Sequence, residues 1–95
     1  MIECPACHGC FSAAALLAGC SGFQRGSGLV GGQCPLCGQA FECRVGKGRI
    51  EIGYTYWAGS LHFEALSLAR VAGLELDTAS TPPAALLGGV RYPLA

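Results

Sequence analysis

The chain has 95 residues, of which 52% are hydrophobic and only 13% charged, and its formal net charge is zero. This length fits one domain with an adequate but small hydrophobic core. The basic excess with which proteins neutralise a nucleic-acid backbone is missing. Because so small a chain cannot bury all its apolar residues, the composition predicts that a protein partner or a second copy in a homodimer covers part of the surface.

The first residues, Met1-Ile2-Glu3-Cys4, carry no basic region of the kind that begins a signal peptide, and no apolar run in the chain is long enough to span a membrane. We therefore expect a cytoplasmic protein that is not inserted in a membrane. In a reducing compartment, seven cysteines are typical of metal ligands and buried thiols, not of a disulfide framework.

Two short cysteine motifs, Cys4-Pro5-Ala6-Cys7 and Cys34-Pro35-Leu36-Cys37-Gly38, carry the clearest chemistry in the chain. Two cysteines separated by two residues can turn both sulfurs toward one point, and two such pairs supply the four thiolates of a tetrahedral zinc site. Four thiolates and one Zn²⁺ would bring the net charge to about −2. The predicted ligands of one zinc ion per chain are Cys4, Cys7, Cys34 and Cys37.

The segment between the motifs predicts a short helix and a loop. Ser12 is a typical N-cap for a helix over 13–18, which Gly19 would end, although a strand is the alternative for residues 11–20. The stretch from Gly19 to Gly32 is rich in glycine and predicts a flexible loop.

A β-hairpin is predicted after the second motif. Apolar and polar residues alternate over 41–45 and again over 50–56, on both sides of a glycine-containing turn. One register satisfies both faces of the hairpin, so it is well specified. The predicted pairs are Val45 with Ile50, Cys43 with Ile52 and Phe41 with Tyr54 on one face, and Arg44 with Glu51 on the other.

The two Cys-Pro-x-Cys motifs and the hairpin resemble the zinc-ribbon, or rubredoxin-like, family over residues 1–57. The resemblance implies that Cys4, Cys7, Cys34 and Cys37 are the metal ligands, and it says little about function. Rubredoxins share this plan but hold iron and transfer electrons. They are typically acidic and have glycine where this chain has His8. These two differences disfavour electron transfer, which is kept as a second alternative.

The remaining cysteines and histidines offer little for catalysis. Cys43 lies on the apolar face of the hairpin and is expected to be a buried thiol. Cys10 is close enough in sequence to the first motif to replace a ligand, and so is His8. A site closed by four sulfurs leaves no position for water or substrate, so we expect no enzymatic activity.

The C-terminal part predicts a helix and a tail. Ser60 is a typical N-cap for a helix from Leu61 to Ala72, with Gly73 just past its end. An apolar stripe would pack on the hairpin, and Phe63 on the other side would need cover from a second copy, a different protein or the Leu86-Leu87 tail. Prolines then predict an irregular apolar tail over 77–95.

These expectations combine into a small α+β fold: a zinc ribbon with two cysteine knuckles and a β-hairpin, plus an appended C-terminal helix, in one domain over 1–76. The function that fits is a non-catalytic protein-interaction or scaffolding module. The main alternative is a nucleic-acid-binding, transcription-related zinc ribbon, suggested by Arg44, Lys47 and Arg49 near the hairpin tip.

Overall fold

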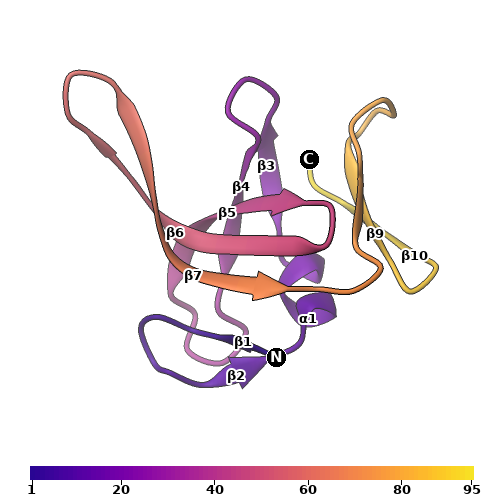
Figure 1. Ribbon diagram of the computed structural model, residues 1–95, viewed down its shortest axis with the longest axis horizontal. Coiled ribbons are helices and arrows are strands. Elements are labelled where there is room, and N and C mark those ends of the chain that lie inside the picture. Colours follow the sequence, from indigo (N-terminus) through magenta and orange to yellow (C-terminus); the bar gives the residue numbers. More distant parts are fainter.

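The computed structural model describes residues 1–95 and consists mainly of β-strands, with one short helix (Figure 1). The predicted α+β class with an appended helix is therefore wrong, and the chain is a small β-rich fold. Its largest sheet is antiparallel, with the strand order β3-β4-β5-β6-β7. Its strands are β3 (Ser21–Gln24), β4 (Leu29–Gln33), β5 (Ala40–Gly46), β6 (Arg49–Trp57) and β7 (Leu61–Arg70).

Two small antiparallel sheets flank the large one. β1 (Ile2–Glu3) pairs with β2 (Cys10–Phe11) at the amino terminus. β8 (Glu75–Asp77), β9 (Ala84–Leu87) and β10 (Val90–Pro93) form a second sheet in the order β10-β9-β8, drawn in orange and yellow in Figure 1. The tail expected to be irregular over 77–95 therefore contains regular strands.

The short helix between the cysteine motifs is confirmed as α1 (Ala13–Ala18). The hydroxyl of Ser12 accepts a hydrogen bond from the Ala15 N–H at 3.1 Å, which satisfies one of the free amides of the first turn. Leu16 and Leu17 are buried against the large sheet's core. The one helix has six residues, too few to span a membrane.

The β5–β6 hairpin has the predicted register. Glu51 is opposite Arg44, and their side chains form an ion pair at 3.7 Å. On the other face, Cys43, Ile50 and Ile52 are buried. The structure pairs residues 42–46 with 49–53, so the predicted pair of Phe41 with Tyr54 falls just beyond the ladder.

The helix expected from Leu61 to Ala72 is wrong, because Leu61–Arg70 form β7 instead. β7 pairs with β6 along its whole length, with a bulge between Ile52 and Gly53. An isolated β6 would leave one edge of a nine-residue strand unpaired, and pairing it outweighs the helix propensity of a segment rich in leucine and alanine. Phe63 is half-buried, with the Arg44 guanidinium 4.9 Å from its ring centre, so no second copy is needed to cover it.

The loop expected from Gly19 to Gly32 is also wrong, because it forms the β3–β4 hairpin. Gly28 closes its turn with a φ of 73° and donates a hydrogen bond to the Gln24 carbonyl at 2.7 Å. A side chain at Gly32 would come within 2.7 Å of the Cys43 sulfur, so this glycine lets β4 pack closely on the core.

The C-terminal sheet is tied to the same core as the cysteine motifs. Ala85 and Leu94 are fully buried in the main hydrophobic cluster. The Phe23 N–H donates to the Leu94 carbonyl at 2.9 Å, which covers the β3 edge. A hydrogen bond from Arg91, with further ones from Ser80, lowers the pKa of Asp77 to about 2 and orders the turn after β8.

Candidate metal centre

Each cysteine motif forms a tight knuckle between two strands, the first between β1 and β2 and the second between β4 and β5. In both knuckles the N–H of the first cysteine donates to the carbonyl five residues later. The carbonyl of that first cysteine accepts a hydrogen bond from the N–H four residues later, and all four donor–acceptor distances are 2.9 Å. The bonds are Cys4 to Gly9, His8 to Cys4, Cys34 to Gln39 and Gly38 to Cys34.

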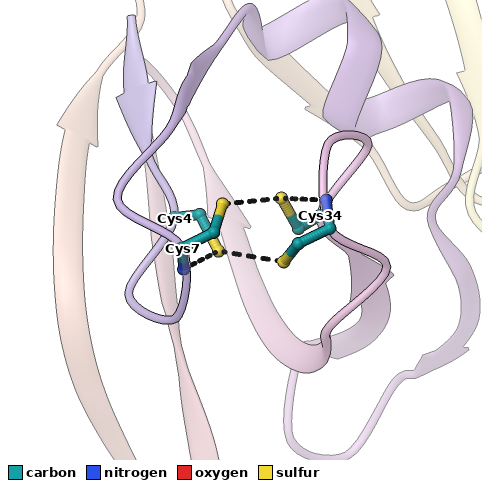
Figure 2. Close-up of side chains that lie close together, drawn as sticks. Cys4, Cys7 and Cys34 are labelled. Atoms are coloured by element: carbon teal, nitrogen blue, oxygen red, sulfur yellow. Dashed lines mark hydrogen bonds between the residues drawn. The ribbon is translucent and has the colours of Figure 1, made fainter.

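The two knuckles bring the four predicted ligand sulfurs together within 4.8 Å of one another. The Cys4 and Cys37 sulfurs are 3.8 Å apart, as are those of Cys7 and Cys34. Sulfurs at the corners of a tetrahedron with metal–sulfur bonds of about 2.3 Å are separated by about 3.8 Å. In Figure 2 the side chains of Cys4 and Cys7 face Cys34 across this gap. The cluster therefore has dimensions that can hold one metal ion.

Backbone amides point at the first sulfur of each knuckle. The Ala6 N–H lies 3.3 Å from the Cys4 sulfur, and the Leu36 N–H lies 3.3 Å from the Cys34 sulfur. A second amide, from the last cysteine of each motif, adds bonds of 3.5 and 3.4 Å. Such donors stabilise thiolates, the form of cysteine that binds metal.

These contacts separate the pKa values of the sulfurs. Burial raises the pKa of Cys34, but hydrogen bonds from the amides of Cys37 and Leu36, together with those to the side chains of Cys37 and Cys4, outweigh it and hold this pKa at about 6. The Gln39 amide lowers the pKa of Cys37, yet burial and hydrogen bonds to the other three cysteines raise it to about 12. Four thiolates this close repel one another, and a cation bound among them removes that obstacle.

The cluster lies at the edge of the hydrophobic core. Cys4 and Cys34 are buried in the main cluster, whereas Cys7 and Cys37 reach the surface. A metal here would join the β1–β2 hairpin to the β4–β5 end of the large sheet. Because β1 and β2 have only two residues each, that link would account for much of the local stability.

His8 occupies the position in the first knuckle that Gly38 occupies in the second. Both have positive φ, 62° for His8 and 80° for Gly38, and only glycine adopts this conformation without steric cost. His8 also lies 3.2 Å from the Glu3 carboxylate, but both side chains are exposed and such pairs contribute little.

Replacing His8 by glycine is therefore expected to stabilise the metal-loaded protein by about 1 kcal/mol, which raises the Tm by about 4–8 °C. Thermal unfolding followed by circular dichroism measures this shift. Gly38→His is the matched reverse substitution and should lower the Tm. An unchanged or lower Tm for His8→Gly would contradict the strain assigned to the first knuckle.

The other cysteines lie outside the cluster. Cys43 is fully buried, as predicted from its place on the apolar face of the hairpin. Cys20 is also buried, and its thiol donates to the Leu16 carbonyl at 3.3 Å. Cys10 is exposed in β2, and neither it nor His8 belongs to the sulfur cluster.

Gly9 has a role at the site that was not predicted from the sequence. A Cβ at this position would overlap the side chain of Leu36, because the two knuckles pack directly against each other. The available signal was a glycine two residues after the first Cys-Pro-x-Cys motif, where the chain turns back from Cys7 into β2.

Fold and site together define a small β-rich protein with a four-cysteine cluster that can hold a metal ion, in an arrangement consistent with a zinc ribbon. Comparisons of the chain with protein-family models, curated proteins and solved structures find no match. The function is therefore inferred from the residues and geometry of the chain itself.

Proposed function

We propose that residues 1–57 form a zinc ribbon in which Cys4, Cys7, Cys34 and Cys37 bind one Zn²⁺. The chain then acts as a non-catalytic protein-interaction or scaffolding module. The main support for this proposal is the cluster of four sulfurs within 4.8 Å, with metal-site spacing. The seven unpaired cysteines support a reducing compartment such as the cytoplasm.

A structural role for the metal is supported by what surrounds it. Four sulfurs occupy every position of a tetrahedral ion and leave none for water or substrate. The single pocket of the structure, about 200 Å³, contains none of the four cysteines, and no polar or charged side chain is buried. Rubredoxin-like electron transfer remains the second alternative, and it would require iron in place of zinc.

An interaction role is supported by the apolar surface. Several large apolar side chains remain exposed, and two of them, Trp57 and Leu61, lie directly opposite each other in the β6–β7 ladder. Contiguous exposed apolar surface on a small protein marks a binding surface. The most exposed on the two longest strands, β6 and β7, are Trp57, Leu61, Leu68, Leu66 and Tyr56.

Affinity capture from the native host, with and without nuclease, tests the interaction role. We expect the same proteins to be recovered under both conditions by the metal-loaded chain, and not by a Cys34→Ser variant. Recovery that disappears with nuclease would favour the nucleic-acid alternative.

The nucleic-acid alternative rests on three basic residues near the β5–β6 turn, and each has a nearby carboxylate. Arg44 and Arg49 lie 3.7 and 3.9 Å from Glu51, and Lys47 lies 3.8 Å from Glu75. These carboxylates reduce the positive potential that phosphates would meet.

Mobility-shift titrations at moderate salt are therefore expected to show no tight complex with generic DNA or RNA. At most about three phosphate contacts are available, which gives a shallow dependence of affinity on salt. A submicromolar complex that Lys47→Glu abolishes would overturn this expectation and establish the nucleic-acid function.

A further inference from the structure

The outer part of the β6–β7 hairpin extends beyond the sheet. β5 pairs with β6 only as far as Gly53, whereas β7 continues beside β6 to Trp57. The hairpin therefore projects as a two-stranded arm, visible at the upper left of Figure 1. We call residues 54–64 the arm. On its β5 side, residues 54–57 of β6 form an open strand edge.

The unpaired backbone groups on this edge can be identified. In an antiparallel pair, alternate residues bond to the partner strand. The Ala58 N–H bonds to the Ser60 carbonyl at 3.1 Å, so the even-numbered residues of this part of β6 face β7. The N–H and C=O groups of Thr55 and Trp57 therefore face the open edge, where another strand can pair with them.

A depression lies where β5 ends and the arm begins. Its volume is about 200 Å³, and it is lined by Ala40, Phe41, Glu42, Tyr54 and Thr55. An engineered cavity of about 150 Å³ is sufficient to bind benzene. The depression is therefore large enough for an aromatic side chain presented by a strand at the open edge.

The arm exposes a large apolar area for its length. The exposed fractions of the three large side chains on the open strand are 75% for Trp57, 50% for Tyr56 and 38% for Tyr54. Taking about 200–250 Å² for a fully exposed large side chain, these three leave about 350 Å² in solvent. Leu61 is 56% exposed but lies on β7, away from the open edge. Two such arms would bury about 700 Å² through these side chains, which is the size of a weak, reversible interface.

We propose that the arm binds the arm of a second copy of this chain, edge to edge and antiparallel, with Tyr56 on the two-fold axis. Thr55 then faces the partner's Trp57, and Trp57 faces the partner's Thr55. This proposal rests on the interaction role proposed above and identifies the partner as another copy.

This register uses every unpaired group of the edge. Thr55 of each copy exchanges two backbone hydrogen bonds with Trp57 of the other copy, which gives four bonds between the copies. Centring the pairing on Thr55 instead would place the partner against Gly53, which is already paired with Glu42. With Tyr56 on the axis, the tip of each arm reaches the partner's depression, and the indole of Trp57 can enter it.

Sedimentation equilibrium of the full, zinc-loaded chain over a wide concentration range tests this association. We expect a reversible monomer–dimer equilibrium. Trp57 is the only tryptophan, so its fluorescence should shift to shorter wavelength as the dimer forms.

Two variants test the surface. Thr55→Pro removes an outward N–H that the arm itself does not use, and Trp57→Lys removes the side chain that fills the depression; each should weaken association at least about tenfold. Leu68→Lys is the matched control, because Leu68 is 55% exposed on β7 outside the arm, and it should leave the dimer intact. Zinc content and circular dichroism confirm that each variant is folded.

A zinc-loaded chain that stays monomeric at all concentrations would overturn the dimer and leave the proposed zinc module standing. A dimer that survives Thr55→Pro and Trp57→Lys would overturn the assignment to the arm. A chain without zinc would instead overturn the proposed function itself.

Discussion

Replacing Cys34 with serine is expected to abolish zinc binding and to unfold most of residues 1–57. Cys34 is buried in the core, and its sulfur accepts two backbone amides and lies 3.8 Å from the Cys7 sulfur. Zinc ligation contributes about 10–16 kcal/mol in small domains, as much as or more than the net stability of a whole domain, about 5–15 kcal/mol. Chelation of the metal from the native protein should have the same effect.

Circular dichroism and bound zinc, measured on the same samples, check this expectation. Cys10→Ser is the matched control, because Cys10 is exposed in β2 and lies outside the sulfur cluster. It should keep both the fold and the metal. A Cys34→Ser protein with unchanged dichroism and thermal stability would show that the metal does not organise this half of the chain.

Gly53→Ala is expected to cause the second-largest loss of stability, at least about 3 kcal/mol. A Cβ at Gly53 would overlap the carbonyl oxygen of Glu64, and the Ala65 backbone lies 3.0 Å from the same point. Both belong to β7, so the overlap is relieved only if β6 and β7 separate at the bulge. Denaturant unfolding of the zinc-loaded protein measures the loss.

Gly26→Ala is the control for this substitution. Gly26 has open space around its Cα and no positive φ, so an added methyl group meets nothing. Its stability should stay within about 0.5 kcal/mol of the native protein. If Gly53→Ala behaved like Gly26→Ala, the close approach of β6 and β7 at the bulge would be wrong.

The elements that could be predicted are those with local signals. The β5–β6 register follows from two faces that agree, since shifting it by one residue would bury Arg44 and expose Cys43. Helix α1 follows from a cap at Ser12 and a stop at Gly19. The four cysteines could be predicted to form one cluster, because the two-residue spacing between the cysteines of each motif leaves few directions in which their sulfurs can point.

The elements that could not be predicted depend on distant partners. The segment 61–72 has apolar residues at both helical and strand spacings. Only pairing with the free edge of β6 favours the strand β7 over a helix. The glycines of β4 weaken a strand in isolation, and the packing of Cys43 and Phe41 against Gly32 makes them favourable.

The β9–β10 hairpin does have a local signal in the sequence. Gly88 and Gly89 both have positive φ, 59° and 76°, and join two short apolar strands. A Gly-Gly pair between such runs favours a tight hairpin turn. The prolines before it indicate a break in structure, but they precede β9 and leave its pairing intact.

Elemental analysis of the protein purified from its native host is the decisive measurement for the metal centre. We expect one zinc ion per chain, lost when Cys4, Cys7, Cys34 or Cys37 is replaced by serine and retained in Cys10→Ser. Iron at the same stoichiometry, or no bound metal in a folded chain, would contradict the zinc site.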